Sequence, residues 1–134
     1  WGMSVKMIRI DDRLIHGQIV AAWVKSLSIN RIWIVDDGVA GDTFITNVMK
    51  MVAPPDAELI ITGTDGIASR IKEFGVGLKE LNVGGMGANA DRKKLFKNIS
   101  ASESELADLR AMKEMGLKVY FQVTPNEKQT LFEG

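Results

Sequence analysis

Apolar and polar residues follow two different periods along this chain, and the two periods alternate. Strict alternation, or a short run of β-branched and aromatic residues, is typical of a β-strand, whereas apolar residues three and four positions apart are typical of a helix. The strand patterns cover Val5–Asp11, Arg31–Asp36, Glu58–Thr62, Leu78–Val83, Phe96–Ile99 and Leu117–Thr124. The helix patterns cover Gly17–Leu27, Thr43–Val52, Asp65–Phe74 and Glu103–Met115.

Two of the predicted helices carry clear signals at their ends. Asp42 is a predicted N-cap, and Pro54-Pro55 end the helix that it opens, because proline lacks the backbone N–H that a helix needs. Ser102 and Glu105 have the spacing of a capping box, in which each side chain accepts a hydrogen bond from the other residue's backbone N–H.

Strands that alternate with helices predict an α/β fold, a single-domain sandwich with a mainly parallel central sheet and helices on both faces. Sheets of this kind place their functional sites at the carboxyl ends of strands, beside the N-termini of helices. Three junctions meet that description, and they are Asp11–Gly17, Asp36–Asp42 and Gly84–Asn89.

Composition narrows the classes of protein that fit. The 134 residues suffice for one domain with its own core. Lys and Arg together number 17, as do Asp and Glu, so the basic surplus that favours nucleic-acid binding is missing. The lack of cysteine excludes disulfides, thiolate metal ligands and a cysteine nucleophile.

No apolar run reaches the roughly 18 residues of a membrane span, and no signal peptide is recognisable. We expect a cytoplasmic domain over residues 3–134, without direct membrane insertion; Trp1-Gly2 precede Met3 and are interpreted as added residues.

The first junction contains the only histidine of the chain, His16. Gly17 lets a ligand approach the backbone, and the unpaired N–H groups near Gly17 and Gln18 attract anions to the start of the helix. The helix dipole also disfavours an imidazolium, so His16 stays neutral and nucleophilic, while Arg13 offers a fork of donors to phosphate oxygens. These residues predict a phosphoryl-transfer site with His16 as covalent acceptor. On chemistry alone, a purely structural histidine fits equally well.

Asp11 and Asp12 at the same junction support a second hypothesis. Paired carboxylates suit Mg²⁺, as in receiver domains that are phosphorylated on an aspartate. Those domains also need a lysine near a late strand end, and none ends the Leu117–Thr124 strand. The plainer interpretation is that Asp12 caps the turn and that Asp11 pairs with Arg13 or Arg9.

The other two junctions supply candidate supporting residues. Asp36 and Asp37 are expected on the same rim as His16, either as acceptors for Arg13 or as ordinary loop and N-cap residues. Gly84 and Gly85 begin a glycine loop that is expected to let the backbone and a partner approach that rim.

Two further patterns carry less weight. The run from Gly85 to Ala90 matches a dinucleotide fingerprint, but the charged residues after it are a poor start to the apolar helix that such a site requires. The basic residues Arg92, Lys93, Lys94 and Lys97 are interpreted as a solvated face or as a surface for an acidic partner.

Several segments resemble one known family in the same order along the chain. They are IDDRLIHGQIVAAW (Ile10–Trp23), WIVDDGVAGD (Trp33–Asp42), MVAPP (Met51–Pro55), LNVGGMG (Leu81–Gly87) and GLKVYFQVTPNE (Gly116–Glu127). Together they resemble the IIB component of the mannose/fructose/sorbose family of the bacterial phosphoenolpyruvate-dependent sugar phosphotransferase system. A non-catalytic ligand-binding α/β domain is the alternative of a different class.

The resemblance implies a phosphoryl relay. A IIA protein would donate the phosphoryl group to Nδ1 of His16, with Arg13 beside it, and the group would pass to a sugar imported by the IIC and IID membrane components. It implies a transferase that lies at the inner face of the membrane through IIC and IID, with no cofactor and no metal ion.

The sequence departs from the family pattern in one place. Between Pro55 and Gly63 the family normally carries an additional helix and strand, so this chain is shorter there by about one crossover element, a dozen or more residues. We expect that the element near residues 56–63 is shortened or omitted; omission is favoured, because losing a crossover would reverse a strand or force a left-handed connection.

Overall fold

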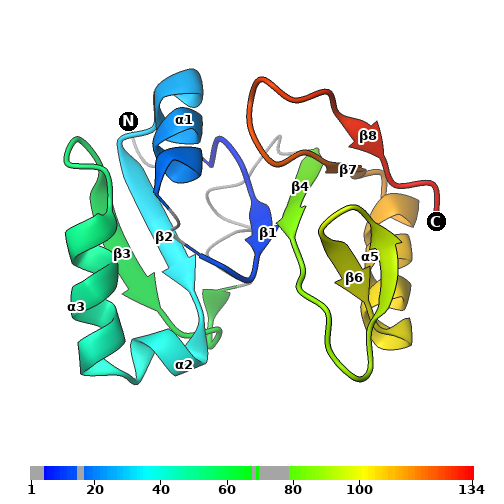
Figure 1. The fold of residues 1–134 in the computed structure, drawn as a ribbon, viewed down its shortest axis with the longest axis horizontal. Helices are drawn as coiled ribbons and strands as arrows, with labels where there is room; N and C mark the ends of the chain where they lie inside the picture. The colour runs from blue at the N-terminus through cyan, green and yellow to red at the C-terminus, as the bar shows by residue number, and fades with distance from the viewer. Residues whose placement is uncertain (1–4, 15–16, 68, 70–78) are drawn as a thin grey trace. The chain divides into compact units, whose positions relative to one another are not determined.

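The computed structural model describes residues 5–14, 17–67, 69 and 79–134. These residues form two compact units (Figure 1). One contains Met7–Arg13 and Leu78–Gly134, and the other contains the N-terminal residues and Leu14–Gly77. Each unit is considered by itself.

The elements follow one another in a mixed α/β order. The strands are β1 (Arg9–Asp11), β2 (Arg31–Val35), β3 (Glu58–Thr62), β4 (Glu80–Gly85), β5 (Lys93–Phe96), β6 (Ile99–Ala101), β7 (Lys118–Phe121) and β8 (Thr130–Leu131). The helices are α1 (Gln18–Leu27), α2 (Asp37–Ala40), α3 (Thr43–Val52) and α5 (Glu103–Glu114).

The unit that contains β1 is built on a four-stranded sheet in the order β1-β4-β7-β8. β4 is parallel to both β1 and β7, and β8 is antiparallel to β7. The carboxyl ends of β1, β4 and β7 therefore meet at one edge of this sheet, which is where the first and third predicted junctions begin.

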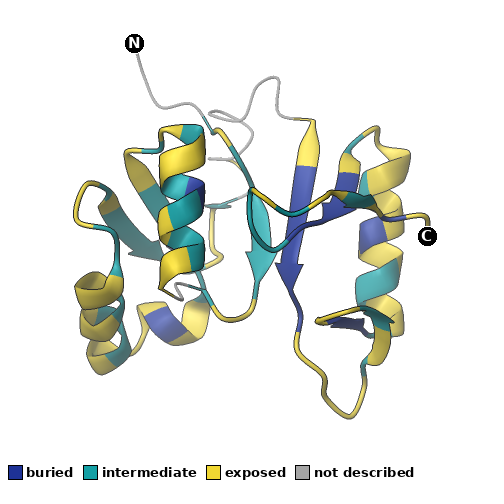
Figure 2. Cartoon of the chain, turned by 45° about the horizontal axis from the view of Figure 1, so that its top comes forward, coloured by how far each residue is buried: buried dark blue, intermediate teal, exposed yellow. Residues whose placement is uncertain are grey.

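The core of the same unit lies around β4 and β7, whose buried residues are dark blue in Figure 2. Val83 and Ile99 are fully buried, and Leu109 of α5 packs into the same cluster. Phe121 of β7 stacks on Phe96 with 5.0 Å between ring centroids and meets Phe132 edge to face at 6.2 Å. Aromatic and aliphatic burial of this kind supplies most of the stability of a small domain.

In the other unit β2 and β3 form a parallel pair in continuous register from Arg31 opposite Glu58 to Val35 opposite Thr62. α2 and α3 connect the two strands, so β3 is not reversed relative to β2. Phe44 and Met51 on α3 are exposed.

The predicted α/β class with mainly parallel strand pairing is confirmed, and so are the most strongly signalled elements. The helix at Thr43–Val52 has the predicted bounds, with the Asp42 carboxylate accepting from Ile45 N. The capping box at Ser102 and Glu105 is formed in both directions.

Other boundaries differ from the prediction. The strand predicted at Phe96–Ile99 is wrong, because β5 and β6 pair in an antiparallel hairpin that turns between these two residues. β1 begins only at Arg9, where its pairing with β4 starts, and β7 ends at Phe121. The sequence patterns also missed α2 and β8. The helix predicted at Asp65–Phe74 falls largely on residues outside the described ranges, as does Leu78.

Among the described residues, none of the helices combines the length and the apolar character that crossing a membrane requires.

Candidate functional site

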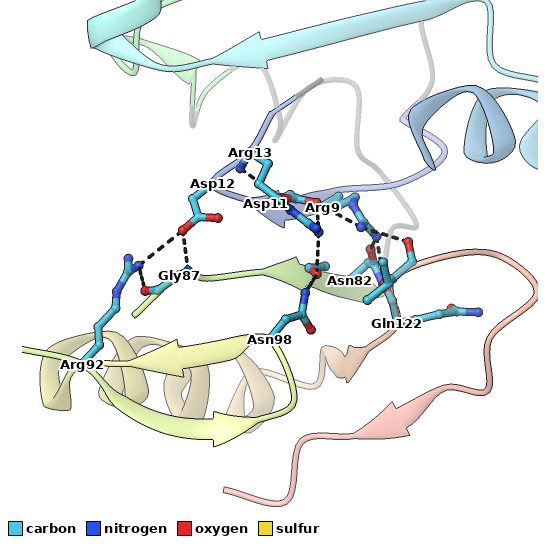
Figure 3. A network of polar contacts seen from close by, with 11 residues as sticks. Arg9, Asp11, Asp12, Arg13, Asn82, Gly87, Arg92, Asn98 and Gln122 are labelled. Carbon is cyan, nitrogen blue, oxygen red and sulfur yellow. Dashed lines mark hydrogen bonds and ion pairs between the residues drawn. The ribbon is translucent and has the colours of Figure 1, made fainter. Parts of the chain in front are cut away.

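The end of β1 places three charged side chains in a row at the carboxyl edge of the sheet. A shift of register between Ile10 and Asp11 sets Asp11 opposite Gly85, one residue beyond the position that regular pairing would give. Irregularities of this kind redirect a side chain at a strand end. As a result Arg9, Asp11 and Arg13 lie side by side (Figure 3).

The Asp11 carboxylate holds Arg13 from two directions. Its Oδ1 accepts from Nε and from the backbone N of Arg13, both at 3.0 Å, and its Oδ2 accepts from Nη2 at 3.1 Å. Nη2 also donates to the Gly84 carbonyl at 3.2 Å. Arg13 Nη1 donates to no described residue, and the side chain is 41% exposed. The guanidinium is thus fixed along one edge, with a nitrogen left for an incoming oxyanion.

The same carboxylate is shared with a second, more buried arginine. Arg9 Nη2 donates to Asp11 Oδ2 at 3.1 Å and to the Val123 carbonyl at 3.0 Å, while Nη1 donates to the Gln122 carbonyl at 2.9 Å and to Asn82 Oδ1. Burial lowers the pKa of Arg9, and the charge of Asp11 acts in the opposite direction.

The glycines after β4 make room for this cluster. A Cβ at Gly84 would overlap the Arg9 guanidinium, and one at Gly85 would lie 2.9 Å from Arg13 Nη2 and from Asp11 Oδ1. A side chain at either position would therefore displace these arginine and aspartate side chains from where they lie. The sequence analysis had predicted only that these glycines let a partner approach.

Asp12 connects the end of β1 to the glycine loop and to α5. Its backbone N donates to the Gly85 carbonyl at 3.1 Å, and its Oδ2 accepts from Gly87 N and lies 3.6 Å from Arg92 Nη1. Arg92 Nη1 also donates to the Gly87 carbonyl at 2.8 Å (Figure 3). The remaining nitrogens of Arg92 form a two-point pair with Glu105, at 2.8 and 2.7 Å.

Arg92 is therefore not part of a solvated basic face. Its side chain is 19% exposed, and its hydrogen bond to Glu105 raises its pKa. Lys93, Lys94 and Lys97 are exposed as the sequence pattern indicated.

Glu105 is expected to make the stability of the protein depend on pH in the acid range. Its hydrogen bonds from Arg92 and from Ser102 N hold its pKa at about 2, below the ordinary value of 4.5. A lowered folded-state pKa means that the stabilising contribution is complete above the ordinary value and is lost as the pH falls toward the folded-state value. Between about pH 5 and pH 2 the midpoint of thermal unfolding should therefore fall more steeply for the wild type than for Glu105→Gln. Circular dichroism melts across this range test it, and parallel pH profiles for the two proteins would contradict it.

Gly17 and Gln18, the predicted phosphate-binding residues, open α1 in the other unit. Gly17 is the N-cap with φ of 64°, a backbone conformation that favours glycine, and no described atom lies within 4 Å of the position a Cβ would take. The first turn of α1 contains no acidic residue. His16 itself lies outside the described residues.

Asp36 and Asp37 have local structural partners in that same unit. Asp36 caps α2 by accepting from Val39 N at 2.9 Å. Asp37 accepts from the backbone N and from Oγ1 of Thr64, both at 2.8 Å, and the backbone contact lowers its pKa. The ordinary loop and N-cap interpretation therefore accounts for both, and their predicted approach to His16 stays a prediction.

The structure thus brings together Asp11, Asp12, Arg13, Gly84 and Gly85, all from one unit, and adds residues that the sequence analysis missed. The added residues are Asn82, Gln122, Arg92 and Glu105. Arg9 was predicted only as a possible partner of Asp11, and that pairing is confirmed. One sequence signal points to Arg9, because a charged residue inside an otherwise apolar strand needs a buried partner. Within the described ranges no group of three His, Cys, Asp or Glu side chains could hold a metal ion.

Comparison with known proteins places this arrangement in a family. The family model described as "PTS system sorbose subfamily IIB component" matches residues 5–68 and 57–133. The N-acetylgalactosamine-specific phosphotransferase enzyme IIB component 1 of Escherichia coli (strain K12) is 28% identical over 149 aligned positions, with 94% of each chain covered. The mannose-specific EIIAB component of the same strain is also 28% identical, over 87% of this chain and 43% of that longer protein.

A solved structure agrees at the level of the fold. The IIBSor domain of the sorbose permease from Klebsiella pneumoniae superimposes with a TM-score of 0.86 at 24% identity, covering 96% of this chain and 93% of that one. The charged cluster lies at the carboxyl edge of a parallel sheet, which is where α/β proteins of this class bind their ligands. The chain belongs to the sorbose-subfamily IIB family of the sugar phosphotransferase system, whose members are phosphotransferase components of sugar uptake.

The comparisons also bear on the length of the chain. The alignment with the N-acetylgalactosamine relative runs over 149 positions, more than the 134 residues present here, so that relative contains residues without a counterpart in this chain. The two family matches both include residues 57–68, at the place where a shortened or omitted element is predicted. Which of the two applies stays a prediction.

Proposed function

We propose that this chain accepts a phosphoryl group from a IIA protein on Nδ1 of His16 and passes it to a sugar during uptake through IIC and IID. The observation that carries the proposal is the way in which the Arg13 guanidinium is held. Its guanidinium is fixed by Asp11 along one edge, and its Nη1 donates to no described residue. This cation stands three positions before the only histidine of a IIB-family chain.

The transfer from the histidine of IIA to His16 needs a nucleophile and positive charge, but no general base. The lone pair of neutral Nδ1 attacks the phosphorus in line, and the bond from phosphorus to the donor nitrogen breaks, leaving its electron pair on the donor imidazole. In the second step a sugar hydroxyl oxygen forms the new bond to phosphorus and its proton passes to water, while the bond from phosphorus to Nδ1 breaks and its electron pair returns to the imidazole of His16. Arg13 and the amides at the start of α1 offset the charge on the equatorial oxygens in both steps.

Gly17 and Gln18 support the phosphate site from the helix side. The open space beside the Gly17 backbone and the absence of acidic residues in the first turn suit a dianionic group.

The partners follow from the relay. The name of the mannose-specific EIIAB relative joins a IIA and a IIB component in one protein, which supports a IIA phosphodonor for this chain. IIC and IID would hold the chain at the cytoplasmic face of the membrane. A receiver-like domain and a non-catalytic binding domain are both disfavoured by the family match.

A reconstitution tests the proposal. The purified chain is incubated with labelled phosphoenolpyruvate, the two general phosphotransferase proteins and a matching IIA, with a sample lacking IIA as control. We expect label on the chain that is labile in acid and stable in base, as a phosphohistidine is, and only when IIA is present. A label that hydroxylamine removes would instead indicate an acyl phosphate on Asp11 or Asp12 and would overturn the proposal.

A further inference from the structure

Three exposed lysines lie on the hairpin of β5 and β6, and the relay described above does not use them. They are Lys93, Lys94 and Lys97, here called the hairpin lysines. Among the described residues, none of them forms an ion pair with a carboxylate. Asp91 and Glu103 flank the open end of the hairpin, so the positive charge is greatest toward its turn. The whole chain has no net charge, and the positive patch is therefore a local feature.

The hairpin is held firmly against the core of its unit. Phe96 stacks on Phe121 with 5.0 Å between the ring centroids, and Ile99 is fully buried. Ser100 N donates to the Met86 carbonyl at 2.8 Å. The backbone that carries the hairpin lysines is thus fixed, and a partner needs to order only their side chains.

The turn of the hairpin lies beside the carboxyl edge of the sheet. Asn98 Nδ2 donates to the Gly84 carbonyl at 2.8 Å, and the same carbonyl accepts from Arg13 Nη2 at 3.2 Å (Figure 3). In the proposed relay this edge faces the membrane components while the phosphoryl group passes to the sugar. A positive hairpin beside the same edge then lies toward the anionic headgroups of the cytoplasmic leaflet, whose field falls off within about 10 Å.

The side chains of the hairpin suit a lipid surface better than a protein surface. Aromatic residues and arginine are the usual anchors of protein interfaces, whereas lysine is depleted there. Leu95 and Phe96 pack against the core of their own unit, and Arg92 is paired with Glu105. The cations left exposed on the hairpin are ammonium groups, which are mobile point charges that many phosphates attract without requiring one geometry.

We propose that the hairpin lysines bind anionic phospholipid headgroups and so hold the chain, without insertion, at the membrane surface where the sugar receives its phosphate. The inference rests on the proposed function for the direction in which the hairpin faces, while the attraction to headgroups follows from the charges themselves. Each lysine should raise the partition of the chain to an anionic membrane about fivefold, and the three together about a hundredfold.

Sedimentation with lipid vesicles tests the proposal. The purified chain is mixed with vesicles of phosphatidylglycerol and phosphatidylcholine in equal parts, or with vesicles of phosphatidylcholine alone. We expect binding to the anionic vesicles only, and weaker binding as salt is added. The triple variant Lys93→Gln, Lys94→Gln, Lys97→Gln should lower the partition coefficient about a hundredfold. A wild-type chain that stays in the supernatant with anionic vesicles at low salt would overturn the proposal.

The matched control replaces three exposed lysines that are dispersed over the same unit, as Lys79→Gln, Lys113→Gln and Lys128→Gln. It changes the net charge by the same amount and should lower the partition coefficient by at most about threefold. Equal losses in the two triple variants would contradict the proposal, because binding would then depend on net charge and not on the hairpin.

Labelling in solution separates this inference from the relay. With soluble IIA and no vesicles, the hairpin variant should take label at the wild-type rate, and its unfolding midpoint should match that of the wild type. Slower labelling with vesicle binding retained would identify the hairpin as a protein-docking surface and would overturn the lipid contact. A wild-type chain that binds anionic vesicles through the hairpin but takes no label from IIA would overturn the relay and support the lipid contact.

Discussion

Replacing His16 with alanine should abolish phosphoryl uptake from IIA. The chain contains one histidine, so no second imidazole can take over as acceptor. In the proposed relay the covalent step forms a phosphoramidate bond to Nδ1, and removal of the nucleophile eliminates that step instead of slowing it. Most substitutions outside a packed core change stability little, so the unfolding midpoint should stay close to that of the wild type.

Labelled phosphoenolpyruvate and gel autoradiography measure this outcome, with a melting curve of the same sample as the control for folding. Retained label would move the acceptor to an aspartate. The structure disfavours phosphorylation of an aspartate, because both oxygens of Asp11 bond arginine side chains and Asp12 Oδ2 accepts from Gly87 N. Asp11→Asn and Asp12→Asn would then show which carboxylate carries the label.

Local signals explain which parts of the fold could be predicted from the sequence. The bounds of α3 follow from the Asp42 cap and the two prolines after the helix, and the start of α5 follows from its capping box. Both signals act within a few residues. The strand predicted at Phe96–Ile99 is wrong because the pairing of β5 with β6 is a tertiary choice, which two apolar residues beside a turn do not encode.

The end of β7 shows a second limit of prediction from the sequence. Its apolar pattern continues past Phe121, where the strand ends, and the carbonyls of Gln122 and Val123 accept from Arg9. Their donor lies more than a hundred positions away in the sequence, and no local pattern contains that information.

The candidate site likewise contains residues that local sequence signals predict and residues that only the tertiary structure brings to it. Asp11, Asp12 and Arg13 follow one another at a strand end, so the chemistry of one turn was enough to select them. Arg92 and Glu105 lie far along the chain from that turn, and in the sequence they are an ordinary basic run and an ordinary capping glutamate. Only the packing of the hairpin and α5 shows that both support the loop after β1. The sequence predicted the glycine pair as part of the site. The steric reason for glycine there became clear only from the position of the Arg9 side chain.

Replacing Arg13 with alanine should slow phosphoryl transfer by about 10²–10³, both from IIA and to the sugar, which is the usual cost of losing one donor from an electrostatic site. The phosphoryl group carries roughly two negative charges during transfer, and a neutral imidazole brings no positive charge to offset them. Arg13 Nη1 has two N–H groups and no described acceptor, so it is placed to serve equatorial oxygens while Asp11 holds the opposite edge. Arg13→Lys should recover only part of the rate, because an ammonium offers a point charge and cannot bond Asp11 and a phosphate with separate edges.

The alternative is that Arg13 only pairs with Asp11 and supports the loop. Arg31→Ala is the matched control, because it removes another partly exposed arginine from a carboxylate, Glu58 at 3.2 Å, and should leave transfer unchanged. Rapid-quench measurement of single turnovers in each direction separates transfer from the docking of IIA. A structural role would lower the unfolding midpoint of Arg13→Ala while leaving both transfer rates at wild-type values. Loss of rate with an unchanged midpoint, partly restored by lysine, would instead identify Arg13 as the cation that meets the phosphoryl group.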